Sequence, residues 1–354
     1  MIITVGGPML RVHFLNVGHG DCTIIRHPSG RLTMIDINNS QQFDSKTFSE
    51  ELAEERRKLQ SNPLARALGL AGVAPASPYS PSGVALGLAP APVGLLGDMS
   101  DILEVIARQK RELTDPIDFM KRTYPNQTLW RYIQSHPDLD HMRGLKKLYE
   151  CIGFENFWDT GHTKERPTFR SNSADRDDWD FYQLLRRAEI GKLYVRGSAE
   201  FAFGKDEYGM PGGDNIEILS PTRELIGACN TAQQSNDVSL VLRIHHAGKS
   251  ILLPGDAEAL AWDSMVNYYG PRLKSDVLKA SHHGRDSGYH QNAVRLIAPR
   301  YTIVSVGAKP DTDASNKYRQ QTSGRVPSTR YHGNIEVMIS DTGVINCYVD
   351  RNGD

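Results

Sequence analysis

The apolar positions at the start of the chain fall into short runs that are rich in β-branched residues. Segments containing glycine or proline separate these runs, as is typical of hairpin connections between strands. Ile24 and Ile25 are adjacent, which favours a strand that is buried on both faces. The pattern predicts three strands, at Leu10–Val17, Cys22–Arg26 and Arg31–Ile37.

The second half of the chain alternates apolar runs with amphipathic stretches, and no repeat period is visible. Further strands are predicted at Thr128–Gln134, Ile216–Leu219, Val238–Ile244, Ser250–Leu253, Val277–Ala280, Thr302–Val306, Ile335–Ile339 and Val344–Val349. Helices are predicted at Met142–Tyr149, Arg176–Ala188, Glu258–Tyr268 and Asn292–Ile297. This order indicates an α/β (α+β) fold in which helices cover two mixed sheets.

The region between the third and fourth predicted strands has a different character. Charged or amphipathic helices are expected at residues 43–59 and 99–113. Between them, residues 62–97 are rich in Ala, Gly, Leu and Pro and almost free of charge, which indicates an inserted low-complexity loop. We therefore expect a single domain over residues 1–354 that carries this insertion.

Charge and cysteine content narrow the function very little. Lys and Arg number 41 and Asp and Glu 42 among 354 residues, so the net charge of -1 gives no global attraction to nucleic acid or to anionic membranes. The four cysteines form no CxxC pair and predict neither a structural zinc site nor disulfides. The sequence shows no signal peptide and no apolar run long enough to span a bilayer. We expect a cytoplasmic protein without a membrane partner. The sequence does not indicate its oligomeric state.

One short segment concentrates residues that bind metals. His136, Asp138, Asp140 and His141 lie within six positions, directly after an apolar strand. A loop that leaves a strand end can turn several such side chains toward one point. Imidazole nitrogens and carboxylate oxygens are ligands for divalent first-row metals. The segment therefore predicts a metal site rather than a solvated turn.

Three other predicted strands end in residues of the same kind. Asp256 follows the strand at Ser250–Leu253, and His282 and His283 follow the strand at Val277–Ala280. A carboxylate at the first of these ends could bridge two metal ions. Asp36 ends an early strand and either orients a histidine or the bridging water from beneath the site, or is a polar strand-end residue.

Together these segments resemble the metallo-β-lactamase superfamily, and specifically the hydrolase domain of ComEC-type competence proteins. The motifs that carry the resemblance occur in the order of that family and cover nearly the whole chain outside the insertion. They are Phe14–Asp21 (FLNVGHGD), Met34–Asp36, His136–His141 (HPDLDH), Ser235–Leu242 (SNDVSLVL), Pro254–Glu258 (PGDAE), Leu278–Gly284 (LKASHHG) and Ser305–Gly307.

The resemblance implies a four-layer αββα sandwich with two divalent metal ions at one edge, between the sheets. In such enzymes the metals hold a hydroxide that attacks a phosphoryl or acyl centre. Carried over to this sequence, the metal ligands would be His136, Asp138, Asp140, His141, Asp256 and one of His282 and His283, with His282 slightly favoured. Asp140 and Lys279 become the catalytic candidates. Asn236 and Ser239 become candidates for substrate contact, or for strand polarity and turn capping.

The sequence departs from the broader superfamily in two respects. Asp138 replaces the second histidine of the usual His-x-His-x-Asp-His pattern, and no clear central histidine motif follows; His162, His245 and His246 are the only candidates, the last two in an apparent hairpin turn. A site richer in oxygen favours Mn²⁺ or Mg²⁺ relative to Zn²⁺ and suits phosphodiesters. The histidine that family members often carry after the Ser-Val-Gly strand is also missing beyond Asn316-Lys317-Tyr318.

Three functions are compatible with these features. The leading one is a metal-dependent phosphodiesterase or nuclease. The phosphates of its substrate could contact the basic residues Arg143, Lys146, Lys147, Lys279 and Arg285. The second keeps the metal site but hydrolyses a small molecule such as a lactone, a phosphoester or a cyclic nucleotide, with residues 62–97 as a lid. The third is a binding or regulatory module with a vestigial metal site.

Overall fold

A computed structural model describes residues 8–40, 113–169, 173–188, 191–200, 203–204, 213–307 and 310–351. These residues belong to one compact unit, formed by residues 1–42 together with 113–354. The predicted helices at 43–59 and 99–113 and the predicted insertion at 62–97 lie almost entirely outside the described residues. Those three expectations, and the single-domain organisation built on them, therefore stay predictions.

The larger sheet of the described residues has eight strands in the order β13-β12-β1-β2-β3-β4-β5-β6. Its strands are β1 (Leu10–Phe14), β2 (Thr23–Arg26), β3 (Leu32–Ile35), β4 (Leu129–Ile133), β5 (Phe154–Asp159), β6 (Gly191–Leu193), β12 (Ile335–Ile339) and β13 (Ile345–Val349). The strands from β3 to β6 run parallel, whereas β1 and β2 pair antiparallel with their neighbours. The sheet is therefore mixed, as the sequence predicts.

The smaller sheet has five strands in the order β11-β10-β9-β8-β7. These are β7 (Ile216–Ser220), β8 (Val241–His246), β9 (Lys249–Leu253), β10 (Val277–Lys279) and β11 (Tyr301–Ile303). Strands β9, β10 and β11 are parallel, and β7 and β8 complete the sheet as antiparallel neighbours. Both sheets thus contain a parallel block flanked by antiparallel strands.

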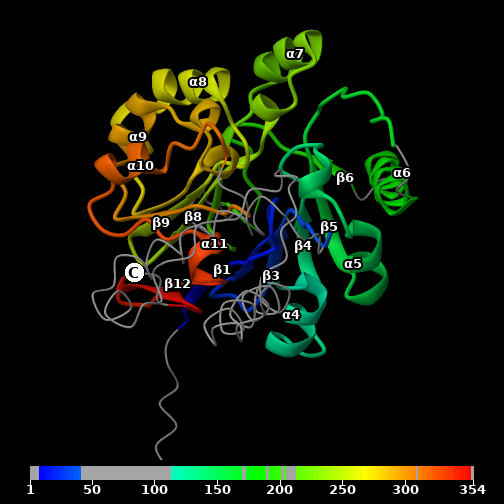
Figure 1. Ribbon diagram of the computed structural model, residues 1–354, viewed down its shortest axis with the longest axis horizontal. Coiled ribbons are helices and arrows are strands. Elements are labelled where there is room, and N and C mark those ends of the chain that lie inside the picture. Colours follow the sequence, from blue (N-terminus) through cyan, green and yellow to red (C-terminus); the bar gives the residue numbers. More distant parts are fainter. Residues whose placement is uncertain are drawn as a thin grey trace, which may run out of the picture. The chain divides into compact units, whose positions relative to one another are not determined.

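Helices cover the outer face of each sheet (Figure 1). On the larger sheet lie α4 (Pro116–Thr123), α5 (Leu145–Cys151) and α6 (Ser173–Arg187), whose apolar side chains share one core cluster with β2, β3 and β4. On the smaller sheet lie α8 (Ala259–Tyr269), α9 (Gln291–Ile297) and α10 (Ser315–Gln321). Two further helices are α7 (Arg223–Ala232) and α11 (Thr329–His332). The predicted αββα four-layer sandwich is confirmed.

The side chains of β9 show why these strands are apolar without alternation. Ile251 and Leu253 point into the core between the two sheets, and Leu252 points into the core beneath the helices. All three are at most 3% exposed. A strand that is covered on both faces needs an apolar side chain at every position, and that run identifies it in the sequence.

The topology brings several strand ends to one edge of the sandwich. In open sheets, functional groups gather beyond the carboxyl ends of parallel strands. Asp36 follows β3, the loop 134–141 follows β4, Asp256 follows β9 and His283 follows β10. Because β1 runs in the same direction as β3, the loop after β1 reaches this edge as well.

Several elements differ from the sequence expectation. Strands β5 and β6 and helices α4, α7, α10 and α11 were not predicted, because their apolar positions are few or interrupted by polar residues. Strand β8 begins at Val241 rather than Val238, since residues 236–238 form a turn of 3₁₀ helix. That turn places Asp237 where its carboxylate accepts hydrogen bonds from the backbone of Glu258 and Ala261, at the start of α8.

Candidate metal centre

The loop after β4 carries the predicted metal-binding segment and is held from below by Asp36. The carboxylate of Asp36 accepts hydrogen bonds from the backbone N–H and the hydroxyl of Ser135, at 2.7 and 2.6 Å. Its Oδ2 atom also lies 2.8 Å from Nδ1 of His141. Asp36 is 1% exposed and lies where the sequence analysis expected it, in contact with a histidine of the site.

Four side chains converge above this loop on what we call the first position. Oδ2 of Asp256 lies 3.3 Å from Nε2 of His141 and 3.4 Å from Nε2 of His283. Oδ2 of Asp140 lies 3.4 Å from the same nitrogen of His283. Ligands of one metal ion about 2.1 Å away are separated by about 3–3.5 Å, so these spacings fit a shared divalent cation.

The orientation of both imidazoles is set by their other nitrogen. Nδ1 of His141 faces the Asp36 carboxylate and Nδ1 of His283 lies 3.0 Å from the backbone carbonyl of Ser305. Because both partners can only accept, each Nδ1 carries the hydrogen. In the neutral ring, Nε2 is then left with a free lone pair that points at Asp256. This tautomer is the one required of a metal ligand.

The two adjacent histidines lie at different depths. His283 is 1% exposed and belongs to a group with Asp21, His141 and Asp256 whose ligand atoms lie within 4.8 Å of one another. His282 lies farther out, with Nε2 3.9 Å from Asp256 and Nδ1 2.8 Å from Glu258. The structure thus places His283, and not the slightly favoured His282, at the first position, and the preference for His282 as a ligand stays a prediction. It rested on nearness to the strand end, whereas the backbone turns at this point.

That turn is an unusual one. His282 and His283 both have left-handed backbone angles, φ 48° and 54°, and Gly284 follows with φ 75°. Side chains with a Cβ rarely adopt this conformation, and such residues concentrate at functional sites. The double left-handed step swings the His283 ring inward beside Asp140 and Asp256.

Several polar atoms at the centre are buried without a hydrogen-bond partner among the described residues. They include Nε2 of His136, His141 and His283 and Oδ1 of Asp256. Buried polar groups are normally satisfied, and exceptions call for a bound ion or water. The orphaned atoms are a matching set of two kinds of metal donor, so a divalent cation fits this site.

The charges around the centre point the same way. Burial alone would raise the pKa of Asp256, but the rings of His283 and His141 hold it well below its ordinary value. Burial alone would lower the pKa of His141, but the carboxylates of Asp256 and Asp36 hold it well above its ordinary value. Each group thus needs an opposite charge beside it. A metal cation meets the need of the carboxylates and leaves the imidazoles neutral.

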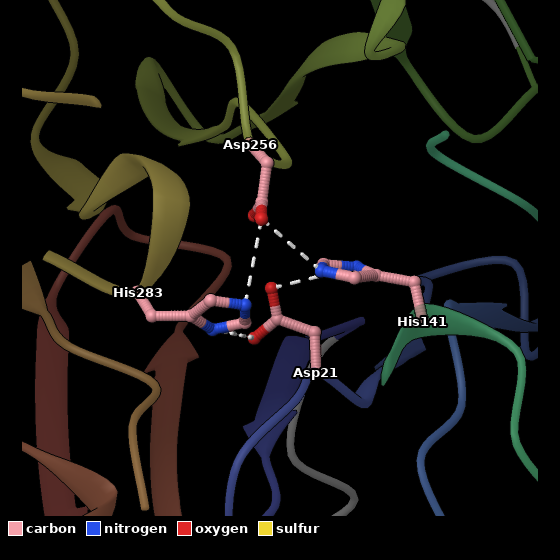
Figure 2. A group of neighbouring side chains, drawn as sticks. All are labelled: Asp21, His141, Asp256 and His283. Carbon is pink, nitrogen blue, oxygen red and sulfur yellow. Dashed lines mark ion pairs between the residues drawn. The ribbon is translucent and has the colours of Figure 1, made fainter. Parts of the chain in front are cut away.

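Asp21 is the main member of the site to which the sequence analysis gave no role, although it lies in the matched Phe14–Asp21 motif. Its carboxylate lies 3.9 Å from Nδ1 of His141 and of His283, opposite Asp256 (Figure 2). It also forms a buried ion pair with Lys279, Oδ2 to Nζ 2.5 Å. Burial would raise the pKa of Asp21, and Lys279 with the two imidazoles lowers it.

This ion pair places Lys279 differently from the expectation of a catalytic or substrate-binding lysine. Its side chain is 4% exposed and lies behind the imidazoles, on the side away from their Nε2 atoms. A buried ammonium in this place neutralises Asp21 and has no surface to offer a substrate. Its spacing along the sequence could not show that, because β10 is buried on both faces.

The remaining predicted ligands lie around the same oxygen of Asp256, at what we call the second position. Nε2 of His136 lies 3.8 Å from Oδ2 of Asp256 and 3.9 Å from Oδ1 of Asp138. Nε2 of His282 lies 3.9 Å from the same oxygen of Asp256. These spacings are looser than those at the first position. Asp138 is also paired with Lys164, Oδ1 to Nζ 2.6 Å.

None of the candidates for a central histidine joins the second position. Nε2 of His162 lies 2.6 Å from the Tyr182 hydroxyl, and its Nδ1 accepts from the backbone N–H of Lys164. His245 and His246 close β8 beside the turn to β9, at the end of that hairpin opposite Asp256. The expectation of a hairpin turn there is confirmed, with Ala247 and Gly248 at φ 48° and 73°.

Asn236 and Ser239 support the site from behind. The Ser239 hydroxyl accepts a hydrogen bond from the backbone N–H of Asp256, at 3.1 Å, and Ser239 is 0% exposed. Asn236 donates to the Glu258 carboxylate, which holds Nδ1 of His282. This geometry matches the turn-capping alternative for Ser239, and the substrate contact of both residues stays a prediction.

The basic residues near the centre divide into paired and unpaired. Arg143 forms an ion pair with Asp175, and Lys147 lies 3.9 Å from Asp115, so both are directed at α6 and α4. The guanidinium of Arg285 lies instead 3.4 Å from Nε2 of His282 and 3.3 Å from Nε2 of His19. Of these three residues, Arg285 is the one whose side chain lies beside histidines of the centre.

Before any relative is considered, the structure shows an αββα sandwich with a buried Asp/His group that could hold a metal ion. No family model matches the chain. It is 29% identical over 185 residues to the "Competence protein ComA" of Neisseria gonorrhoeae. It is 31% identical over 131 residues to the "ComE operon protein 3" of Bacillus subtilis (strain 168). The predicted resemblance to competence proteins of the ComEC type is confirmed.

The similarity covers only part of each relative. The matched stretches take up 51% and 34% of this chain but 25% and 15% of the two relatives. Among solved structures, the chain is similar to Igni18, "a novel metallo hydrolase" from Ignicoccus hospitalis KIN4/I, with a TM-score of 0.44, 13% identity and coverage of 96% and 98%. CmlA, "a diiron beta-hydroxylase from Streptomyces venezuelae", also has a TM-score of 0.44, at 10% identity and with coverage of 92% and 53%.

The membrane prediction can be tested within the described part of the chain. No helix there combines the length and the hydrophobicity that crossing a bilayer would require.

Proposed function

We propose that this protein is a metal-dependent hydrolase that cleaves phosphodiester bonds, with nucleic acid as its substrate. The proposal rests on the first position, where the Nε2 lone pairs of His141 and His283 meet the carboxylates of Asp140 and Asp256 at 3.3–3.4 Å. A divalent cation bound there supplies a Lewis acid that lowers the pKa of water and neutralises phosphate charge. A ligand set with as many carboxylates as imidazoles favours Mn²⁺ or Mg²⁺ relative to Zn²⁺.

The protein's own residues prepare this chemistry. Asp36 and the Ser305 carbonyl fix the tautomer of the two imidazoles, so no reorganisation is needed when the cation binds. Asp256 lies 3% exposed on a loop that Ser239 supports. Lys279 neutralises Asp21 beneath the rings, and this limits the excess of negative charge that would otherwise repel an anionic substrate.

The open side of the centre supports an anionic substrate. Asp140 and His19 retain side-chain exposures of 23% and 41% and therefore lie on the side from which a substrate approaches. The guanidinium of Arg285 lies at this side and pairs with no carboxylate within the described ranges. A planar guanidinium is well suited to phosphate oxygens. One relative is named a competence protein, which further supports nucleic acid.

The proposal is tested by incubating the Mn²⁺-loaded protein with single-stranded and double-stranded oligonucleotides. Asp256→Asn serves as the inactive variant, and Asp263→Asn, an exposed carboxylate of α8, as the matched control. We expect cleavage by the wild type and by Asp263→Asn, and none by Asp256→Asn. Equal cleavage by all three proteins would show a contaminating nuclease and would refute the proposal.

Hydrolysis of a small phosphoester is the second candidate, because the charges of Arg143 and Lys147 are paired with Asp175 and Asp115. A panel of a lactone, a cyclic nucleotide and an activated phosphodiester, run beside the oligonucleotides, separates the two. A folded protein that retains no divalent metal would favour the third candidate, a binding module with a vestigial site.

A further inference from the structure

The first and second positions differ in how free their donor atoms are. At the first position, both Nε2 atoms lack a hydrogen-bond partner among the described residues, and so does the second oxygen of Asp256. At the second position, a cation of the protein already lies beside two of the donors. Lys164 contacts Asp138, and Arg285 lies 3.4 Å from Nε2 of His282.

The contact to Asp138 involves the oxygen that a metal would need. Oδ1 is the atom of Asp138 that faces Nε2 of His136. This same oxygen accepts hydrogen bonds from Nζ of Lys164 at 2.6 Å and from the hydroxyl of Ser235 at 2.9 Å. Nζ of Lys164 and Oγ of Ser235 also lie 3.3 Å apart. The three groups form a closed arrangement around one carboxylate oxygen.

Lys164 is held in this place by His162, one of the candidates for a central histidine ligand. The backbone N–H of Lys164 donates to Nδ1 of His162, at 3.0 Å. Nε2 of His162 is fixed in turn by the hydroxyl of Tyr182. His162 therefore positions Lys164 and does not present its imidazole to the second position.

The positive charge of Lys164 affects metal binding at the second position. A neutral imidazole at residue 138 would offer a metal a free lone pair. The pair of Asp138 and Lys164 is also neutral overall. In this pair, however, the ammonium of Lys164 already compensates the negative charge that Asp138 would offer a metal. A divalent cation near Oδ1 would be repelled by the ammonium group unless Lys164 swung away.

We propose that Lys164 makes the centre unequal: the first position binds one divalent cation tightly, and the second binds only weakly because the metal must displace the Lys164 ammonium from Asp138. Lys164 is thus a positioning residue for Asp138 that sets the metal occupancy of the site. The inference rests on the metal dependence of the proposed function but not on the identity of its substrate.

The test is a titration of Mn²⁺ into metal-free protein by calorimetry, with the number of bound ions counted by native mass spectrometry. Lys164→Met removes the charge and keeps the aliphatic stem, and Lys164→Arg keeps the charge. Lys249→Met is the matched control, because Lys249 also pairs with an aspartate, Asp276 at 3.5 Å, but at the opposite end of β9. The Lys164 side chain is 30% exposed, so folding should survive, and thermal unfolding checks this.

We expect the wild type to bind a second Mn²⁺ at least about tenfold more weakly than the first, and Lys164→Met to strengthen only the second event by about tenfold. Lys164→Arg and Lys249→Met should behave as the wild type. Two ions of equal affinity in the wild type, or an unchanged second event in Lys164→Met, would overturn the inference. Unequal binding without any hydrolysis would instead refute only the proposed function, whereas a protein that binds no metal would refute both.

Discussion

Two groups of buried histidine and aspartate lie in the same sandwich and differ in one respect. The first is the metal centre around Asp256. The second, which we call the closed cluster, consists of Asp159, His162, Tyr182 and Arg186. In the closed cluster, Asp159 accepts from the Tyr182 hydroxyl at 2.5 Å and from Nε of Arg186 at 2.7 Å. Arg186 also donates to the backbone carbonyl of His162.

Both groups contain histidine and aspartate, but they differ in whether the polar atoms of these residues have hydrogen-bond partners. Every ring nitrogen and carboxylate oxygen of the closed cluster has a partner within the protein. In the described part of the chain, the metal centre instead has polar atoms without a hydrogen-bond partner, among them three imidazole nitrogens and Oδ1 of Asp256. A satisfied network stabilises a fold, whereas orphaned donors aimed at one point indicate an exogenous ligand.

The largest expected effect comes from Asp256→Asn. Loss of the shared carboxylate should reduce hydrolysis by at least about 1,000-fold, more than the 10–100-fold typical of residues that only orient a ligand. The folded state should survive, because the substitution removes a buried charge that has no hydrogen-bond partner at Oδ1. Oligonucleotide cleavage and thermal unfolding measure the two effects. A variant that loses stability but retains activity would show that Asp256 stabilises the fold and does not serve hydrolysis.

Asp159→Asn should have the opposite profile. It removes the counter-charge of Arg186, whose side chain is 22% exposed, so the free energy of unfolding should fall by about 2–3 kcal/mol. Metal binding at the first position should stay unchanged, since no atom of the closed cluster belongs to it. Urea denaturation and Mn²⁺ titration test the prediction. A fall in metal affinity beyond twofold would mean that the two groups are coupled.

Asp36→Asn should weaken metal binding by about 10–100-fold with a smaller effect on stability. The amide keeps much of the shape but can no longer accept strongly from both Ser135 and Nδ1 of His141. The matched comparison is Asp178→Asn, a carboxylate that accepts from the backbone of Gly144 and Lys146 outside the site. Equal losses of metal affinity in the two variants would rule out a specific role for Asp36 in orienting His141.

The smallest effect, counted per pH unit, concerns the stability of the closed cluster. Burial, with the charges of Arg186 and Lys164, lowers the pKa of His162 to about 3. Its folded pKa lies below the unfolded value of about 6.5, so the unfolded state binds the extra proton between these values. The free energy of unfolding should therefore fall as pH decreases from 6.5 toward 3, by about 1 kcal/mol per pH unit from this residue.

Metal-free His162→Gln should show a shallower decline over the same range, measured by urea denaturation at several pH values. A glutamine can still donate to the Tyr182 hydroxyl but does not titrate. Identical slopes for the wild type and the variant would mean that His162 is not held neutral in the folded protein.

The sequence by itself determined the elements that are buried on both faces and the residues that end them. Runs such as Ile251–Leu253 can only be covered strands, and the polar residue after each run must lie at a sheet edge. This reasoning identified Asp36, Asp256 and the segment from His136 to His141 as site candidates from the sequence alone. It did not reach the short elements β5, β6 and α7, whose patterns are weak because only part of each is covered.

Tertiary structure alone decided which of these residues share a point. Whether His282 or His283 turns inward depends on two left-handed backbone angles that no local propensity favours. The pairing of Lys279 with Asp21 and of Lys164 with Asp138 joins residues 258 and 26 positions apart. Such contacts depend on how two sheets stack, and the free energy of a buried charge depends on every neighbour within a few ångströms. The chain lists the donors in order, but the fold determines which of them are left without a partner.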